Sequence, residues 1–395
     1  MKTAGKIARE EGVSLYLVGG TVRDLLLGRP TEDLDLVVEG DAETLASIIA
    51  KRLSGQVISR SQFSTAKIKV EGVSLDMITA RNERYLRPGA LPQIAHSNME
   101  DDLARRDFSI NAMAFSLHLG TRGQLLDPFS GEADLRSGLI RVLHDKSFVD
   151  DATRIMRAVR YEQRLSFRLD GDTETLLRRD LPMLDTISGD RLRREFQLCL
   201  KEERSVAIIL RADQLGIMGT IHTSLAGSGE VVQSAMWRSG QGSLDEQVCL
   251  GILAYTLNQA EGEQFIGRLR MPPRWTTVVR DTIALKNKLP WISDSTLSPA
   301  QLYEALAPST LAAVQACALA APNEKARRNL TLFLEELRHV KPSLGGRDLI
   351  ELGVPQGPAI GEMLLRLRLA RLEGTVINRS EEVALVKDRL TTQAG

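Results

Sequence analysis

Two aspartates, Asp33 and Asp35, stand one residue apart at the start of an apolar run in the segment PTEDLDLVVEG, residues 30–40. Alternate residues of an extended strand face the same side, so this spacing predicts two neighbouring carboxylates on one face. Like charges that close repel each other unless something binds between them. Coordination of a divalent cation is the chemistry that suits the pair, and a merely polar strand start is the alternative.

A Gly-Gly turn precedes the two aspartates. The segment LYLVGGTVRDLLLG, residues 15–28, predicts an apolar strand, a turn at Gly19 and Gly20, and a short helix that carries Arg23. Glycines let the backbone approach a phosphate closely, and a helix N-terminus favours an anion. The third glycine of the dinucleotide-binding fingerprint is missing, and an ordinary strand-to-helix turn is the alternative. Together, the turn and the aspartates indicate a triphosphate bound with Mg²⁺.

A third carboxylate is expected on a neighbouring strand. Asp76 lies between Leu75 and Met77 in VSLDMIT, an otherwise apolar run. A buried carboxylate without a partner is costly, so a metal partner would account for it, although a strand-end aspartate is the alternative. Metal ions held by such carboxylates stabilise both the attacking and the leaving oxygen of an in-line displacement.

The elements that must hold these residues change character near residue 146. Before it, short apolar or alternating runs predict strands, and DAETLASIIAKRLSG predicts a helix capped by Asp41. KIKVEGVSLDMI predicts a hairpin that turns at Glu71 and Gly72. After residue 146, apolar residues recur at helical spacing. The pattern predicts an α/β N-terminal domain followed by an all-helical remainder.

The composition bounds the class of protein. The 395 residues exceed one ordinary core and predict two or more domains. Lys+Arg and Asp+Glu balance at 51 each, so a nucleic acid would have to be bound by a local basic patch. Three scattered cysteines match no metal-ligand spacing and suit a reducing cytoplasm. No apolar stretch reaches membrane-spanning length, so no membrane partner is expected. Nothing in the sequence predicts an oligomeric state.

Five segments in order carry a resemblance to a known family. They are GGTVRD, EDLDL, DDLARRDFSINAMAF, DPFSGEADLRSGLIRV and DDATRIMRAVRYEQRLSF. Their order and spacing resemble the class II tRNA nucleotidyltransferases, which comprise CCA-adding enzymes, relatives that add only C or only A, and bacterial poly(A) polymerase. The resemblance is dense over residues 13–200, and a weaker echo follows at residues 345–364.

The resemblance implies an α+β fold with a polymerase-β-like, mixed-sheet nucleotidyltransferase head and a helical neck, body and tail. The head would span residues 1–145 and the neck, which carries the base template, residues 146–210. The body would span residues 211–340 and the tRNA-binding tail residues 341–395.

The family uses the segment RRDFSINA to select ribose over deoxyribose and to touch the nucleotide. A carboxylate or an amide can bond a 2′-hydroxyl, and an arginine can grip a phosphate. A solvated charged loop is the alternative. The residues implied here are Arg105, Arg106, Asp107 and Asn111.

The segment DDATRIMRAVR places a charged residue every three positions, which predicts a narrow stripe along one helix face. A surface ion-pair ladder is the alternative. In the family, the first Asp and Arg of this motif form hydrogen bonds with the Watson–Crick edge of incoming C or A, which implies that Asp151 and Arg154 carry base specificity. Neither C nor A offers the imino donor of U or G. The resemblance further implies that Arg157 and Arg160 face the triphosphate.

Two further segments bear on the site. SGDRLRREF resembles the motif that supports the template helix, and it implies that Arg191 and Glu195 hold Arg154 by hydrogen bonds. Residues 80–102 are polar, with Gly, two prolines and no clear periodicity, and predict a mobile loop. CC-adding relatives have a shortened loop here, so its full length disfavours a CC-only enzyme.

The sequence therefore predicts a cytoplasmic CCA-adding tRNA nucleotidyltransferase. The tRNA 3′-hydroxyl would attack the α-phosphate of CTP or ATP and release pyrophosphate, with Mg²⁺ held by Asp33 and Asp35 and the hydroxyl activated with help from Asp76. The alternatives are an A-adding enzyme that completes CC-ended tRNA, a poly(A) polymerase and, from a different class, a non-catalytic RNA-binding descendant. The intact carboxylates argue against the last.

Overall fold

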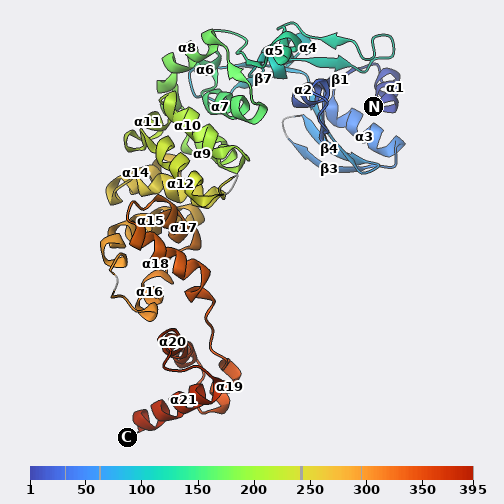
Figure 1. Ribbon diagram of the computed structural model, residues 1–395. Helices are drawn as coiled ribbons and strands as arrows, with labels where there is room; N and C mark the ends of the chain where they lie inside the picture. The colour runs from blue at the N-terminus through green and yellow to red at the C-terminus, as the bar shows by residue number, and fades with distance from the viewer. Residues whose placement is uncertain (32, 62–63, 241–242, 295, 395) are drawn as a thin grey trace. The chain divides into compact units, whose positions relative to one another are not determined.

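The chain folds into two compact units (Figure 1). The computed structural model describes residues 1–395 except 32, 62–63, 241–242, 295 and 395. Unit 1 comprises Met1–Arg204 and Leu215–Thr220, and unit 2 comprises Ser205–Gln214 and Ile221–Gly395. No helix of the described residues is long and apolar enough to cross a membrane.

Unit 1 is built on a seven-stranded mixed sheet with strand order β3-β4-β5-β2-β1-β8-β9. The central strands β2 and β5 are parallel, and the other neighbouring pairs are antiparallel. This arrangement confirms the mixed-sheet head. The strands are β1 Ser14–Val18, β2 Asp33–Glu39, β3 Gln56–Ser61, β4 Thr65–Val70, β5 Val73–Thr79, β8 Ala114–Ser116 and β9 Leu125–Leu126.

Local sequence signals account for several of these elements. The helix α3, Ala42–Arg52, begins after Asp41, whose carboxylate accepts hydrogen bonds from the backbone N–H groups of the first turn. It packs on β3, β4 and β5. The β4–β5 hairpin turns at Glu71 and Gly72, which both have positive φ, as a two-residue turn of this hand requires. Both elements confirm the sequence prediction.

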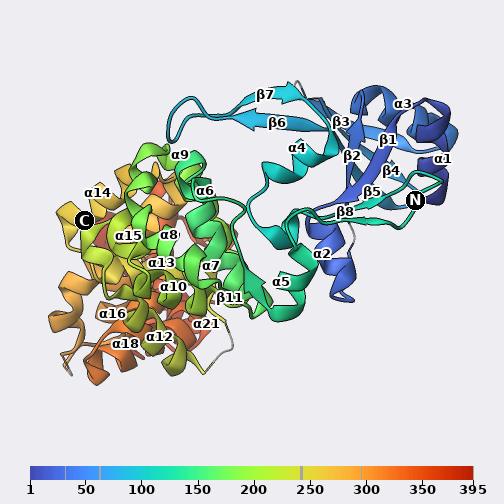
Figure 2. The same ribbon diagram turned by 90° about the horizontal axis from the view of Figure 1, so that it is seen from above.

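A second, two-stranded sheet lies beyond the seven-stranded one. Its strands, β6 Arg81–Arg84 and β7 Gln93–His96, run antiparallel and extend side by side toward α9 (Figure 2). The sequence prediction of a loop without secondary structure over residues 80–102 is therefore wrong in this respect. Paired strands satisfy the backbone of a segment whose side chains show no apolar alternation.

The helices of unit 1 pack on the sheet or follow it in the chain. A two-residue strand, β11 Arg168–Leu169, pairs in parallel with β10 Leu139–Ile140, so the part after residue 146 is not wholly helical as predicted. The other elements are α1 Lys2–Glu10, α2 Gly20–Leu26, α4 Met99–Ala104, η1 Ser109–Asn111, α5 Gly131–Ser137, α6 Ser147–Asp150, α7 Thr153–Leu165, α8 Gly171–Arg179, η2 Leu181–Thr186, α9 Gly189–Lys201 and α11 Ile217–Ile221.

In unit 2, all the described elements are helical. One apolar cluster gathers residues 285–337 and another gathers residues 344–386. The elements are α10 Ser205–Gln214, η3 Thr223–Leu225, α12 Ser228–Ser239, α13 Glu246–Tyr255, α14 Gln259–Leu269, α15 Pro273–Ile292, α16 Pro299–Leu306, α17 Leu311–Ala320, α18 Glu324–Glu335, η4 Leu337–His339, α19 Gly346–Glu351, α20 Pro358–Leu372 and α21 Arg379–Ala394. The helical content agrees with the α+β prediction, while the four-part division of the chain stays a prediction.

The three cysteines lie inside the units and are free thiols. Cys199, Cys249 and Cys317 are each no more than 1% exposed. Burial raises the pKa of all three thiols, to about 12 for Cys249 and Cys317. They are therefore protonated core residues.

Candidate active site

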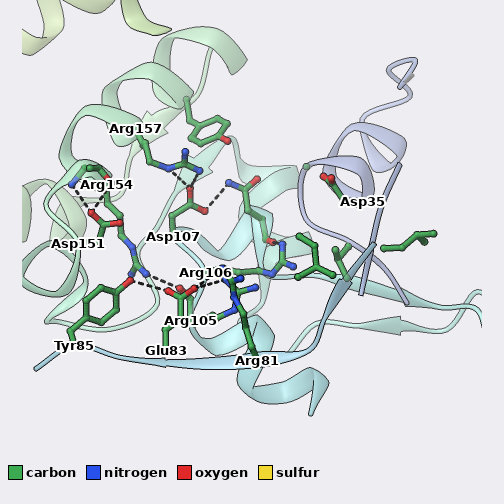
Figure 3. Close-up of a pocket in the computed structure, with 17 residues that line it drawn as sticks. Asp35, Arg81, Glu83, Tyr85, Arg105, Arg106, Asp107, Asp151, Arg154 and Arg157 are labelled. Atoms are coloured by element: carbon green, nitrogen blue, oxygen red, sulfur yellow. Dashed lines mark hydrogen bonds and ion pairs between the residues drawn. The ribbon is translucent and has the colours of Figure 1, made fainter. Parts of the chain in front are cut away.

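A cavity of about 460 Å³ in unit 1 is lined by the central strands, the β6–β7 segment, the loop after α4 and the start of α7 (Figure 3). It brings together residues that lie far apart in the sequence. Of the residues singled out by sequence, those that line it are Gly20, Asp35, Arg105, Arg106, Asp107, Asn111, Asp151, Arg154 and Arg157. In Figure 3, Asp151 and Arg154 lie on one side of Arg157 and Asp35 lies on the other.

The Gly-Gly turn has its conformational need for glycine at Gly19. Gly19 has φ +65°, and a Cβ there would lie 2.5 Å from the guanidinium Nη1 of Arg106. Gly20 is the first residue of α2. The backbone N–H of Asp35 donates to Oγ1 of Thr21 at 3.2 Å, which ties the turn to β2. The Gly-Gly turn is therefore held against the acidic strand β2.

The acidic residues of β2 and β5 lie side by side. Asp35 and Asp76 are direct partners in the parallel register, so Asp76 occupies the neighbouring strand as predicted. The expectation that Asp76 lacks a partner is wrong, because Lys67, its cross-strand neighbour, donates to Oδ2 at 3.1 Å and a third of the Asp76 side chain is exposed. The side chain of Asp33 lies outside the described residues. No group of three metal-ligating side chains occurs in the part of the chain that the structure describes.

The loop after α4 is organised by a buried carboxylate. Asp102 is 0% exposed and accepts hydrogen bonds from Arg105 and Arg106. Burial alone would raise the pKa of Asp102, but the two guanidinium groups outweigh it and hold the pKa below its usual range. Both arginines also line the cavity, and each is already paired with the carboxylate of Asp102.

Asp107 uses its carboxylate to hold other parts of the cavity wall. Its Oδ1 accepts from the backbone N–H of Phe108 and from Nδ2 of Asn111, both at 2.9 Å. Its Oδ2 accepts from Nε and Nη2 of Arg157, at 2.9 and 2.6 Å. Burial acts to raise the pKa of Asp107, but Arg157 and Asn111 lower it by more than burial raises it. The carboxylate therefore stays ionised.

The start of α7 presents the pair assigned to base selection. Arg154 is 5% exposed, and it donates from Nη1 to Oγ of Ser147 at 2.6 Å and from Nη2 to the carbonyl O of Arg105 at 2.7 Å. Asp151 precedes the helix, and its Oδ1 accepts from Thr153 and from Arg191. Each side chain is therefore held in one orientation at the cavity wall.

Two predicted arginines lie away from the cavity lining. Arg160 is 6% exposed and pairs with Glu195 and Glu202. Three residues fall short of one helical turn by about 60°, so a residue at every third position drifts around the helix instead of following one face. The predicted stripe therefore turns away from the cavity after Arg157. Arg23 is also buried, and it bonds Asp24 and Oδ1 of Asn111.

The supporting residues of α9 act on different partners from those predicted. Arg191 donates from Nη2 to Asp151 at 2.8 Å and from Nη1 to the carbonyl O of Gly89 at 3.2 Å. Glu195 lies 3.6 Å from Nη1 of Arg157. Neither holds Arg154, because that guanidinium is already engaged by Ser147 and the Arg105 carbonyl group.

The β6 segment supplies cavity residues that sequence reasoning missed. The carboxylate of Glu83 accepts hydrogen bonds from Arg81 and Arg105, each at 3.0 Å, and from the hydroxyl of Tyr85 at 2.9 Å. Burial, followed by the charge of Glu83, raises the pKa of Tyr85, so its hydroxyl remains a donor. Arg81, Glu83 and Tyr85 alternate in sequence, and this period of two was the signal for a strand with one face on the cavity.

Comparisons with known proteins agree with this geometry. Residues 15–141 match the family model described as the Poly A polymerase head domain. The A-adding tRNA nucleotidyltransferase of Halalkalibacterium halodurans is 34% identical over 98% of this chain and 91% of its own. The CCA-adding enzyme of Geobacillus stearothermophilus is 28% identical over 95% of this chain and 93% of its own. The solved Thermotoga maritima CCA-adding enzyme complexed with tRNA has a TM-score of 0.77 at 29% identity, covering 98% of this chain and 94% of that one.

The similarity extends through both units, and the cavity gathers four of the five segments that carry the sequence resemblance. The Gly-Gly turn, the acidic strand β2, the loop after α4 and the start of α7 all contribute lining residues. The mixed-sheet head and the helical remainder match the architecture implied by those segments. The chain is thus a nucleotidyltransferase that belongs to the class II tRNA nucleotidyltransferase and poly(A) polymerase family.

Proposed function

We propose that the chain transfers AMP from ATP to the 3′-hydroxyl of a tRNA that ends in CC, with release of pyrophosphate. The observation that carries the proposal is one cavity lined both by the base-selecting pair, Asp151 and Arg154, and by Gly20 and Asp35 of the phosphate-binding part. Greater identity to the A-adding relative, 34% against 28% for the CCA-adding one, favours A addition over the predicted addition of C, C and A.

Addition of the complete CCA end is the second candidate. The CCA-adding relatives match the chain over nearly its whole length, and both reactions share the final transfer to CC-ended tRNA. The full length of residues 80–102 counts against a CC-only enzyme. A poly(A) polymerase is disfavoured by the balance of 51 basic and 51 acidic residues, since holding a long RNA gains from excess positive charge.

Base selection follows from which polar groups remain available. Oδ1 of Asp151 is used by Thr153 and Arg191, and Oδ2 is the oxygen that would accept from the 6-amino group of adenine. Arg154 would donate to N1 from the edge that Ser147 and the Arg105 carbonyl group do not use. Guanine carries an N–H donor at N1. It would place this donor against the donor of Arg154, so no hydrogen bond would form there.

The sugar and phosphates would be held by the middle of the cavity. Because Asp107 already accepts four hydrogen bonds, we propose that it holds Arg157 and Asn111 and does not itself bond the ribose. Arg106 and Arg157 line the cavity and would offset the charge of the triphosphate. The backbone of the Gly-Gly turn would approach the phosphates.

The residues present fit a bound Mg²⁺. Asp35 lines the cavity, its register partner Asp76 lies on the next strand outside the lining, and carboxylate oxygens are the ligands that Mg²⁺ prefers. Asp33 and Asp35 would hold the ion, which when bound would neutralise charge on the α-phosphate and the leaving pyrophosphate. Asp76 would accept the proton of the attacking hydroxyl, and the hydrogen bond from Lys67 would fix the orientation of its carboxylate.

The test gives purified protein two tRNAs, one ending at the discriminator base and one ending in CC, with CTP, ATP or both. Addition of a single A to the CC-ended tRNA, and no addition to the other, is expected. Incorporation of C into the first tRNA would replace the proposal with the CCA reaction. Absence of transfer to either tRNA would refute both.

A pair of variants tests the acidic strand. Asp35→Ala should abolish AMP transfer and leave the affinity for tRNA within about twofold, because the carboxylate acts on the phosphates alone. Asp172→Ala removes an exposed carboxylate in the first turn of α8 and should leave the rate unchanged. Transfer by the Asp35 variant at more than about a hundredth of the normal rate would contradict the assignment.

A further inference from the structure

Three guanidinium groups surround the ring of Tyr161. The carbon atoms Cζ of Arg23, Arg157 and Arg160 lie 5.2, 5.5 and 5.2 Å from the ring centroid. Phe108 packs edge-on against the same ring, with centroids 5.8 Å apart. Tyr161 also lines the cavity, so this aromatic centre forms part of the nucleotide site itself.

The three arginines come from two different parts of the site. Arg157 and Arg160 belong to α7, the helix that begins beside the base-selecting pair. Arg23 belongs to α2, the helix that begins at the Gly-Gly turn. Its Nη2 lies 3.5 Å from the place where a Cβ on Gly20 would stand, so it packs against the turn. Tyr161 itself belongs to α7, so the contact between its ring and Arg23 joins this helix to α2.

Each guanidinium is also paired with its own carboxylate. The ring of Tyr161 is the contact that all three guanidinium groups share. Asp24 pairs with Arg23, Asp107 with Arg157, and Glu195 with Arg160. Three cations around one side chain repel one another, and an electron-rich aromatic face attracts each of them. An aliphatic residue of similar size would fill the space without that attraction.

We propose that Tyr161 is a positioning residue for the triphosphate: its ring keeps Arg157 at the cavity wall and Arg23 beneath the Gly-Gly turn. Base selection on α7 and phosphate binding at α2 are thereby fixed relative to each other. The inference rests on the proposed function only for the identity of the nucleotide. It places no contact between Tyr161 and the base, so the choice of base should not depend on the ring.

The experiment compares Tyr161→Phe and Tyr161→Leu, with the affinity for ATP measured by calorimetry in the presence of Mg²⁺ and no tRNA. Tyr161→Phe keeps the ring but removes the hydroxyl, which also interacts with Arg23, and it should retain most of the ATP affinity that Tyr161→Leu loses. Tyr161→Leu should weaken ATP binding about tenfold, since several cation–ring contacts are lost together. Tyr255→Leu removes a ring that lies 5.7 Å from Lys286 in unit 2, and this matched control should not change ATP binding.

A graded series separates attraction from space filling. Phenylalanines with one, two and three ring fluorines at position 161 keep the shape while the attraction for cations falls. The affinity for ATP should fall stepwise along the series, and this series also serves if Tyr161→Leu does not fold. An affinity that is flat across the fluorinated series, or equal for the phenylalanine and leucine variants, would overturn the proposal.

Steady-state kinetics with CC-ended tRNA provide a second, independent reading. Tyr161→Leu should raise the KM for ATP and leave the preference for ATP over GTP unchanged, because Asp151 and Arg154 are not altered. A parallel loss of that preference would show that the ring supports the base site and would overturn the proposal. Failure of the original protein to transfer AMP would refute the proposed function, while the calorimetric result would still decide the role of Tyr161.

Discussion

Asp107→Asn removes the charge that balances Arg157 while keeping the shape of the side chain. Breaking a fully buried ion pair costs about 3–5 kcal/mol. Two features reduce the cost here: the Arg157 side chain is 29% exposed, and Glu195 lies 3.6 Å from its Nη1. We therefore expect a loss of about 2 kcal/mol. For a unit of about 200 residues, this lowers the midpoint of thermal unfolding by about 4–8 °C.

The two units can be followed separately in this experiment. All three tryptophans, Trp237, Trp275 and Trp291, lie in unit 2, so tryptophan fluorescence reports that unit alone. Far-ultraviolet circular dichroism reports both. Asp107→Asn should lower the dichroism transition and leave the fluorescence transition in place.

A second substitution identifies the cause of the loss. Arg157→Gln in the Asp107→Asn background removes the unbalanced cation and should recover about 1 kcal/mol of stability, without recovering AMP transfer. A shift below about 1 °C for Asp107→Asn, or an equal shift of both transitions, would refute the reasoning.

Three further outcomes follow from the site. Gly89 has φ +74°, and an added Cβ would collide with the carbonyl O of Thr186. Gly89→Ala should therefore expose the β6–β7 segment to proteases and slow AMP transfer. Unchanged proteolysis would contradict this packing. Arg191→Ala releases Asp151 and should reduce the preference for ATP over GTP about tenfold in competition assays, and an unchanged ratio would exclude this role. The pKa values of Asp102 and Asp107 are lowered from the ordinary value of an aspartate, so the stability they provide is present above that ordinary value and is lost as the pH falls below it, which urea titrations at stepped pH would measure.

The sequence predicted the elements whose signals are local. The cap at Asp41 and the turn at Glu71 and Gly72 depend on neighbouring residues, and the structure confirms both. The sequence also predicted Asp76 on a strand next to that of Asp35, and the structure adds that the two residues are direct register partners. The resemblance to the family identified the motifs, and these motifs contain most of the predicted residues that line the cavity.

The partners of charged side chains could not be predicted in the same way. Arg191 reaches Asp151 and the carbonyl group of Gly89, and this choice depends on how α9 lies against the β6–β7 segment. Arg160 does not line the cavity and pairs with Glu195 instead, because residues at every third position do not stay on one face of a helix. Glu83 was missed because its strand has no apolar face, so the only signal was an alternation of polar residues.

The burial of the three cysteines makes chemical labelling simple. Thiolates are the reactive form, and Cys199, Cys249 and Cys317 are both protonated and inaccessible, so maleimide dyes should leave them unmodified in the folded protein. A single introduced thiol can then carry a fluorophore without removal of the native ones. Leu91, 76% exposed in the loop between β6 and β7, offers such a position. A dye on Leu91→Cys would report changes in the surroundings of the β6–β7 segment, from which Arg81, Glu83 and Tyr85 line the cavity.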